Sequence, residues 1–279
     1  MVGATGDVGR RILAEAASLV PAVGTSTSND AMLHLDLLRP DEFDYSLLDT
    51  GDVIVLSAGI SAPDACARDP AGAWALNVEG TTQFMKSAID RGARVIFFSS
   101  DTVYGERERD FDETVPSNPV GEYAAMKHTV EERFAGHAQV RSLRLSYVFS
   151  SEDRFTTYLR GCAERGERAE IFHPFYRAVV HRDDVVEGAI ALARRWDEFP
   201  QAVLNFGGPE VIARTSFAQA LKDTVMPELQ FRTVEPAADF FSHRPRVIRM
   251  TSPQLAPLLG RRPRTLREAI GHEFRSGRK

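Results

Sequence analysis

The chain has 279 residues, of which 43% are hydrophobic and 26% are charged, values typical of a soluble globular protein with one large or two small domains. No stretch approaches 18 uncharged apolar residues and the N-terminus lacks a signal-peptide pattern, so we expect neither a membrane span nor export. Cys66 and Cys162 lie far apart in the sequence, which argues against a disulfide framework or a zinc site and favours a reducing cytoplasm.

Charge is unevenly spread along the chain. The 34 Lys and Arg against 39 Asp and Glu give a net charge of −5, yet residues 240–279 carry ten Arg and Lys against Glu268 and Glu273, a local net of +8. Two interpretations stay open: a solvated basic segment, or arginines that face an anionic ligand. A nucleic-acid partner is not expected, because no RNA-binding motif is present and aromatic residues are not interleaved with the arginines.

Short apolar runs alternate with amphipathic stretches over the first half of the chain. Helical periodicity begins at residue 7 and extends to 19. The apolar runs are rich in β-branched and aromatic residues, which is typical of strands covered on both faces. This alternation predicts a parallel α/β sheet. The predicted strands are 22–26, 52–59, 94–100 and 140–149, and the further helices are 70–90 and 121–134.

The pattern changes after about residue 150. Helical stretches are here separated by short strands and by loops that contain proline, which indicates a smaller lobe packed against the sheet. Because no long linker divides the two parts, we expect one compact unit made of a dinucleotide-binding region, 1–150, and an interleaved substrate-binding lobe, 151–279. The predicted elements of the lobe are helices over 154–165, 183–195 and 215–224 and strands over 202–208 and 229–234.

A glycine-rich run, GATGDVG over residues 3–9, opens the first predicted helix. Glycines at this spacing permit a tight turn and close approach of the backbone to a pyrophosphate, and a helix N-terminus supplies unpaired N–H groups. A glycine-rich turn without a ligand is the alternative. The position of the run at the head of an α/β pattern favours the phosphate loop of a Rossmann-like, doubly wound parallel sheet.

A strand normally precedes such a loop, and only Met1 and Val2 stand before Gly3. That strand lies at the centre of the sheet, so its truncation is expected to leave a gap between its neighbours. We therefore expect a few apolar residues upstream in the native gene.

The end of the second strand bears on the choice of cofactor. An acid about 20 residues beyond the loop binds the ribose 2′-OH of NAD, but residues 24–28 read GTSTS and contain no acid. Small hydroxyl side chains accommodate a 2′-phosphate, and the missing acid removes a repulsion. The sequence therefore favours NADP, and NAD stays open with Asp30 binding the ribose from the next turn.

Tyr123 and Lys127 are four residues apart and share one face of the helix predicted over 121–134. Because a nearby cation favours the phenolate, we expect Lys127 to lower the Tyr123 pKa from about 10 towards neutrality. The spacing alone also fits a solvated helix face. The run SSDTVYG over 99–105 ends a strongly apolar strand, at the place where α/β sheets bind ligands.

The phosphate loop, the strand-end serines and the Tyr-x-x-x-Lys pair, in this order and at these separations, resemble the extended short-chain dehydrogenase/reductase family over nearly the whole chain. SSDTVYG is similar to the motif of the family's fifth strand. NVEGT over 77–81 is similar to its fourth-helix motif, and LSAG over 56–59 to the turn after its fourth strand. The resemblance implies an oxidoreductase of the NAD-dependent epimerase/dehydratase type that uses NADP or NAD.

The resemblance also implies roles for single residues. Ser100 hydrogen-bonds the substrate carbonyl, Tyr123 is the acid/base, and Lys127 binds the nicotinamide ribose and tunes Tyr123. Asn77 is a structural residue near the cofactor, whereas Asp7 departs from the usual apolar or aromatic residue and adds a negative charge beside the pyrophosphate. The implied cofactor-binding residues are Gly3, Gly6, Asp7, Val8, Gly9, Thr25, Ser26, Ala58, Gly59, Asn77, Ser99, Tyr123 and Lys127.

Two arginines resemble residues of the family that contact the diphosphate of a sugar nucleotide. Arg177 opens RAVVHRDDV, similar to R-x-x-I-H-V-x-D, and Arg244 lies in HRP, similar to a later R-P motif. Guanidinium groups suit this role because they bind phosphate oxygens in pairs; a surface salt bridge is the alternative for each. Ser100, Asp101 and Thr102 complete the expected substrate site.

His181, Asp183 and Asp184 lie close together in the sequence. We expect no metal site here: one of the two acids is expected to start the helix over 183–195, with His181 packed beneath it.

The expected reaction is reduction of a nucleoside-diphosphate 4-keto sugar in carbohydrate biosynthesis. Related dehydratases carry Asp-Glu after the catalytic hydroxyl, and Asp101-Thr102 lacks that Glu. The length and the motif SSDTVY are similar to the dTDP-4-dehydrorhamnose reductase group. A nucleotide-sugar 4-epimerase with tightly bound NAD and a non-catalytic NADP-binding sensor or partner protein remain alternatives, and the family's paired helices suggest a homodimer.

Overall fold

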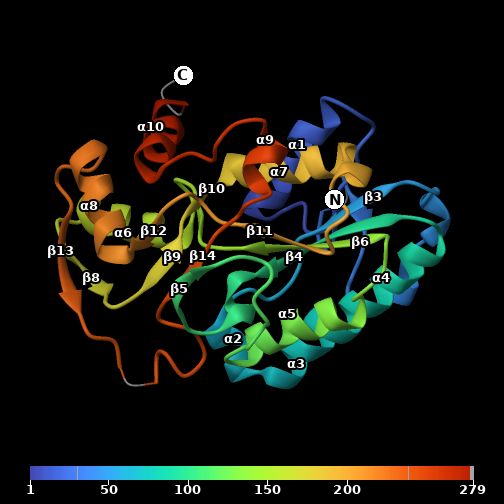
Figure 1. Ribbon diagram of the computed structural model, residues 1–279, viewed down its shortest axis with the longest axis horizontal. Coiled ribbons are helices and arrows are strands. Elements are labelled where there is room, and N and C mark those ends of the chain that lie inside the picture. The colour runs from blue at the N-terminus through green and yellow to red at the C-terminus, as the bar shows by residue number, and fades with distance from the viewer. Residues whose placement is uncertain (30, 238, 277–279) are drawn as a thin grey trace.

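The computed structural model describes residues 1–29, 31–237 and 239–276, and it is built on a central parallel sheet with helices on both faces (Figure 1). The strand order β11-β6-β4-β3 places the longest strand, β4, inside the sheet. This parallel α/β architecture confirms the predicted fold class. The strands are β3 (Val53–Leu56), β4 (Arg94–Ser100), β6 (Val140–Leu145) and β11 (Val203–Phe206).

Residues 1 and 2 occupy the place of a central strand. The Val2 N–H donates to the Val55 carbonyl at 2.9 Å, and the Thr25 N–H donates to the Met1 carbonyl at 2.9 Å. Val2 thus forms parallel bridges to both neighbours and links β3 to the two-stranded extension of β1 (Thr25–Ser26) and β2 (Leu33–His34). The expected gap is bridged at this one position.

The strand β4 explains why the sequence shows an unbroken apolar run instead of an alternation. Val95 and Phe97 face one core and Ile96 and Phe98 face the other, so both faces of the strand are buried. In Figure 1 the helices α4 (Thr81–Asp90) and α5 (Glu122–Arg133) lie below the sheet. Above it lie α1 (Asp7–Ala17), α7 (Arg182–Arg194) and α9 (Leu255–Leu259).

The helix predicted over 70–90 is divided into three pieces. After α3 (Pro70–Trp74) comes a π-helical stretch, Ala75–Gly80, before α4 begins at Thr81. Such π-helical turns are uncommon in proteins, and those that do occur often lie at functional sites. The stretch contains Asn77, whose buried side chain binds the turn after β3.

A smaller lobe lies beside the sheet, at the left of Figure 1, and has its own apolar core. The core is formed by aromatic and aliphatic side chains such as Phe149, Phe217 and Ile270. No strand at β8 and no helix at α10 was predicted from the sequence. The elements of the lobe are α6 (Arg154–Glu164), β8 (Arg168–Phe172), β12 (Val211–Ala213), α8 (Arg214–Thr224), β13 (Gln230–Val234) and α10 (Leu266–Ser276).

Several short elements connect these parts. The strand predicted over 140–149 is interrupted at Ser146 and Tyr147, which face the pocket described below. The short elements are η1 (Pro40–Glu42), η2 (Tyr45–Leu47), α2 (Pro63–Arg68), η4 (Asp101–Tyr104), β5 (Arg107–Phe111), β7 (Val148–Phe149), β9 (Tyr176–Ala178), β10 (Val180–His181), η5 (Trp196–Glu198) and β14 (Ile248–Met250).

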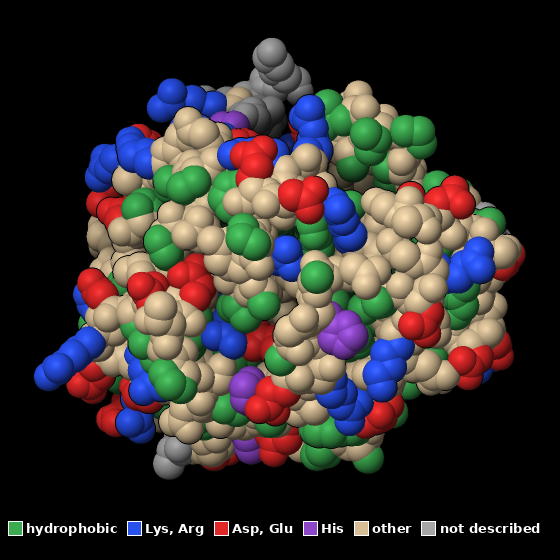
Figure 2. Space-filling view, turned by 45° about the vertical axis from the view of Figure 1, so that its right-hand side comes forward, with side chains coloured by type: hydrophobic (Ala, Val, Ile, Leu, Met, Phe, Trp, Pro, Cys, Tyr) green, Lys and Arg blue, Asp and Glu red, His purple; other side chains and the backbone are tan. Residues whose placement is uncertain are grey.

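Acidic and basic side chains are interspersed over the face shown in Figure 2. Several arginines of the basic C-terminal segment pair with acids of the same chain: Arg261 and Arg264 bind the buried Asp184, and Arg249 binds Asp110 at the surface. In the described part of the chain, every helix is too short or too polar to cross a membrane.

Candidate active site

The glycine-rich run forms the predicted turn at the start of α1. A Cβ atom on Gly3 would lie 2.7 Å from the Ala58 nitrogen, and one on Gly9 would lie 2.1 Å from the Gly3 carbonyl oxygen, so packing requires glycine at both positions. A Cβ on Gly6 would meet only the Gly3 oxygen, at 3.5 Å. The open side of the turn is therefore at Gly6, where the helix begins and its first N–H groups lack helical partners.

Asp7, the unusual acid of this loop, is neutralised by side chains from distant segments. Its carboxylate accepts hydrogen bonds from Arg182 at 2.7 Å, from Ser150 at 2.8 Å and from Arg10 at 3.0 Å. These bonds outweigh burial and lower the Asp7 pKa. The carboxylate thus ties the loop to α7 and to the segment after β7.

The two hydroxyl residues expected near the cofactor ribose are buried at the end of β1. The Ser26 Oγ accepts hydrogen bonds from the Ser28 and Asn29 N–H groups, each at 3.1 Å, and so shapes the turn that follows. Thr25 pairs with Leu33 across β1 and β2. Asp30, the alternative ribose ligand, lies outside the described residues.

Asn77 holds the turn that contains Ala58 and Gly59. Its Oδ1 accepts from the Ile60 N–H at 2.8 Å, and its Nδ2 donates to the Ile60 carbonyl at 2.9 Å. A Cβ on Gly59 would lie 2.9 Å from the Asn77 Oδ1 and 3.9 Å from the Lys127 Nζ. The turn after β3 therefore adjoins the ammonium group of the Tyr-x-x-x-Lys pair.

Ser100, Tyr123 and Lys127 come together at the carboxyl end of β4. Tyr123 and Ser100 line one pocket, where the Ser100 hydroxyl opposes the rise of the Tyr123 pKa. One helical turn further along α5, the Lys127 Nζ donates to the Phe98 carbonyl at 2.8 Å and lies 4.6 Å from the centre of the Phe97 ring. Ser99 points away from this pocket, beside Glu131.

Burial governs the ionisation of this group. It raises the pKa of Tyr123, and the charge of Asp101 raises it further. It also lowers the pKa of Lys127 to about 8. The expectation that Lys127 lowers the Tyr123 pKa is wrong for this chain, because the ammonium lies 6.0 Å from the phenol ring and burial dominates. Tyr123 is thus held as the protonated phenol.

Asp101 and Thr102 surround the Ser100 hydroxyl. The Thr102 Oγ1 donates to the Ser100 Oγ at 2.9 Å. The Asp101 carboxylate accepts from Ser146 at 2.7 Å and lies 3.6 Å from the Arg177 Nε. Burial raises the Asp101 pKa even though these partners oppose the shift.

The pocket is a cavity of about 240 Å³ between the sheet and the smaller lobe. Ser146 and Tyr147 were not predicted as site residues. Like Ser100, they lie at the end of an apolar strand, and this position is the sequence signal that could have identified them. Arg214 was not predicted either, and no motif marks it. The lining residues are Ser61, Pro63, Ser100, Asp101, Thr102, Tyr123, Leu145, Ser146, Tyr147, Phe175, Arg177, Val179, Ile212, Arg214, Phe217 and Arg244.

The two predicted arginines reach this pocket, but both are engaged by the protein. Arg177 donates to the Tyr176 carbonyl at 2.7 Å and to the Pro245 carbonyl at 2.8 Å, besides facing Asp101. Arg244 forms an ion pair with Asp64 of α2 and stacks over Phe240, 4.2 Å from the ring centre.

His181 itself caps α7, which corrects the expectation that an acid starts this helix. Its Nδ1 accepts from the Asp183 N–H at 3.1 Å, and its Nε2 lies 3.0 Å from a carboxylate oxygen of Glu273. Candidate ligand atoms of His181, Asp183 and His272 lie within 4.8 Å of one another. Both ring nitrogens of His181 are nevertheless occupied by these hydrogen bonds.

The sequence of this chain matches a protein-family model over nearly its whole length. Residues 1–277 match the RmlD substrate binding domain. The dTDP-4-dehydrorhamnose reductase of Mycobacterium tuberculosis is 24% identical over 201 residues, an alignment that covers 69% of this chain and 64% of that protein. The chain therefore spans just under two thirds of that relative's length.

Solved structures share the fold at low sequence identity. RMD from Pseudomonas aeruginosa, complexed with NADPH, superposes with a TM-score of 0.75 at 21% identity, covering 98% of each chain. UDP-glucuronic acid 4-epimerase from Bacillus cereus, in complex with UDP-glucuronic acid and NAD, gives a TM-score of 0.76 at 18% identity, covering 98% of this chain and 96% of that one.

Proposed function

The chain belongs to the RmlD substrate binding domain family, and from this premise we propose that it is an NADPH-dependent reductase of a nucleoside-diphosphate 4-keto sugar. The relative named dTDP-4-dehydrorhamnose reductase supports the reaction class, and the NADPH complex of RMD supports the cofactor. One observation carries the proposal: the side chains of Tyr123 and Ser100 line the same pocket, with Lys127 one helical turn from Tyr123 along α5.

The residues present fit a dinucleotide. Gly6 leaves the N-terminus of α1 open to a diphosphate, and Gly59 brings the turn after β3 against Lys127. Thr25 and Ser26 place hydroxyl groups at the end of β1, which favours the 2′-phosphate of NADP. NADPH, when bound, supplies the hydride for the keto carbon.

The reaction needs a proton on the carbonyl oxygen as the hydride arrives. The raised pKa of Tyr123 keeps its phenol protonated at neutral pH, so this residue can donate that proton. Ser100 hydrogen-bonds the same oxygen, and the Lys127 ammonium stabilises the negative charge that develops there. In this scheme residues 1–150 bind the dinucleotide, and residues 151–279 supply Arg177 and Arg244 for the sugar nucleotide.

The test is cofactor oxidation with dTDP-, UDP- and GDP-linked 4-keto sugars. A reductase consumes one NADPH for each sugar reduced. A 4-epimerase with the same three residues interconverts 4-epimers and consumes no NADPH, which would replace the proposal by the epimerase alternative. Binding of NADP without turnover of any sugar would favour a non-catalytic protein.

A further inference from the structure

Arg214 is a pocket-lining cation that the proposed mechanism does not use. It is the first residue of α8 and lines the same pocket as Ser100 and Tyr123. Its guanidinium carbon lies 4.3 Å from the centre of the Phe175 ring and 4.6 Å from that of Phe155. Both rings lie at cation–π distance from the guanidinium, and they take up none of its N–H donors in conventional hydrogen bonds, so these donors remain for a ligand.

The acidic groups near Arg214 are engaged elsewhere. Asp153 caps α6 through the Phe155 and Thr156 N–H groups, at 2.9 and 3.1 Å, and also accepts a hydrogen bond from Tyr147. The Tyr147 ring centre lies 5.9 Å from the Arg214 guanidinium carbon, Asp153 acts on Arg214 through its charge without a hydrogen bond, and Arg177 adds a second positive charge nearby. Among the residues that the structure describes, none accepts a hydrogen bond from the Arg214 guanidinium or forms an ion pair with it.

The other two arginines of the pocket differ in this respect. Arg177 faces Asp101 and donates to backbone carbonyls, and Arg244 pairs with Asp64. Arg214 is therefore the pocket cation whose charge no carboxylate contacts, within the described ranges. Burial lowers the pKa of Arg214, as it does for Arg177 and Arg244, but only Arg214 lacks a carboxylate partner among the described residues. Such a charge is stabilised when a ligand brings an anion to it.

We propose that Arg214 binds an anionic oxygen of the substrate in the pocket that holds Tyr123 and Ser100. The inference rests on the proposed function, because it names the group that recognises this sugar nucleotide. The anionic oxygen belongs to the diphosphate or to a carboxylate on the sugar. Both present the paired oxygens that a guanidinium binds in two parallel hydrogen bonds.

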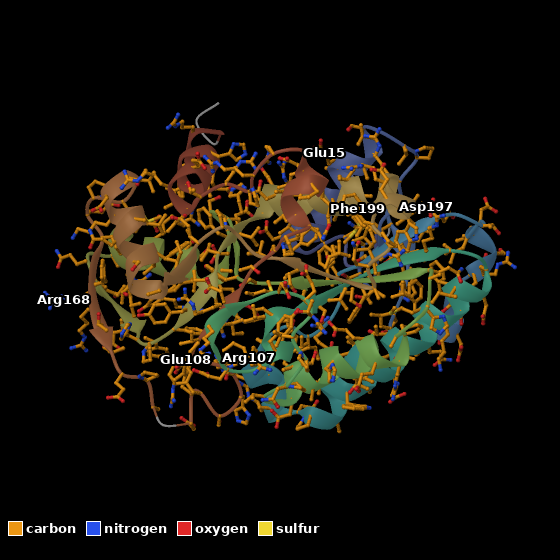
Figure 3. The ribbon with its side chains drawn as sticks, viewed as in Figure 1. Glu15, Arg107, Glu108, Arg168, Asp197 and Phe199 are labelled. Carbon is orange, nitrogen blue, oxygen red and sulfur yellow. The ribbon has the colours of Figure 1, made fainter. Side chains whose placement is uncertain are left out.

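Titration calorimetry in the presence of NADP⁺ tests this without turnover, with UDP, dTDP, UDP-glucose and UDP-glucuronate as probes. We expect Arg214→Gln to weaken binding about tenfold to a hundredfold, the range for lost hydrogen bonds to charged groups. A loss of affinity shared by all probes identifies the diphosphate as the group that Arg214 binds. A loss of affinity confined to UDP-glucuronate identifies a carboxylate on the sugar as that group. The matched control is Arg168→Gln, at an exposed arginine that points outward from β8 (Figure 3).

Arg214→Lys keeps the charge and the stem, so it is expected to fold and to lose less affinity than Arg214→Gln. Circular dichroism of both variants checks the fold. The proposal is overturned if Arg214→Gln and Arg214→Lys bind every probe within twofold of the wild type, if Arg168→Gln loses as much, or if the wild type binds none of the probes. Binding that depends on Arg214, in a protein that oxidises no NADPH with any keto sugar, would refute the proposed function and leave this inference standing.

Discussion

The Asp7 carboxylate and the Arg182 guanidinium meet at 2.7 Å, although 175 positions separate them in the sequence. Asp7 stands where the family has an apolar or aromatic residue, and Arg182 stands where the similar R-x-x-I-H-V-x-D segment has an apolar one. Two departures from the family pattern thus compensate each other. The ion pair neutralises the acid that the phosphate loop would otherwise present to a pyrophosphate.

This pair should show energetic coupling. Asp7→Asn and Arg182→Gln each remove one partner of a partly buried charge, so each is expected to destabilise the fold. The double variant is expected to lose less stability than the sum of the two single losses. We expect a coupling energy of about 1–2 kcal/mol in urea unfolding. The double-mutant cycle of Arg94 and Asp197, an ion pair at 3.4 Å with Asp197 86% exposed, is the control and should couple weakly. Additivity at Asp7 and Arg182 would refute the compensation.

Replacing Tyr123 by Phe removes the proposed proton donor and nothing else. Turnover of the keto sugar should fall about 10²- to 10⁴-fold, because general acid catalysis contributes on that scale. Unfolding by urea should change little. Tyr45→Phe, which removes a hydroxyl bound to the Pro40 carbonyl far from the pocket, should keep full turnover. Near-normal reduction by Tyr123→Phe would exclude Tyr123 from the role.

Lys127 links the active site to the pH dependence of stability. Its pKa is lowered from 10.5 to about 8 by burial, so the folded protein binds fewer protons than the unfolded chain between these values. Stability from this group therefore rises as the pH increases from 8 to 10.5, by about 3 kcal/mol. Lys127→Met should lack this rise and should also lose turnover.

The measurement for Lys127 is urea unfolding across this pH range. Lys86→Met, at an exposed lysine of α4, serves as the control and should follow the wild type. Parallel stability curves for the wild type and Lys127→Met would contradict the predicted uptake of a proton by Lys127 on unfolding.

Glu273 attaches the C-terminal helix to the rest of the protein. Burial opposes ionisation of its carboxylate, but His181 Nε2 at 3.0 Å, the Ser151 N–H at 2.9 Å and the charge of Arg182 together hold its pKa far below the usual 4.5. The stabilisation is present above about pH 4.5 and is lost as the pH falls towards the lowered value. Glu273→Gln should cost about 2–4 kcal/mol at pH 7.

Unfolding of Glu273→Gln at several pH values measures this effect. Its deficit relative to the wild type should shrink below pH 4.5 as the wild-type carboxylate becomes protonated. The exposed Glu228→Gln is the control and should show no deficit at either end of the range. A deficit that does not change with pH would contradict a role for the Glu273 charge.

Local patterns in the sequence specified much of the site. Gly9 is required by its contact with the Gly3 carbonyl within a single turn, and Tyr123 and Lys127 share a helix face because they are four residues apart. The apolar run of β4 predicted a strand buried on both faces, and its end predicted the position of Ser100. Such features depend on neighbours in the chain, so periodicity and spacing are enough to identify them.

Tertiary structure alone decided how the charges are paired. The motif around Arg177 resembles that of a diphosphate ligand, yet the Arg177 guanidinium donates to the carbonyls of residues 245 and 246. No carboxylate among the described residues contacts Arg214, because the nearby Asp153 caps another helix. The Tyr123 pKa likewise follows from burial and not from the spacing of Lys127. Ion pairing and desolvation depend on which distant segments meet, and no local pattern encodes that meeting.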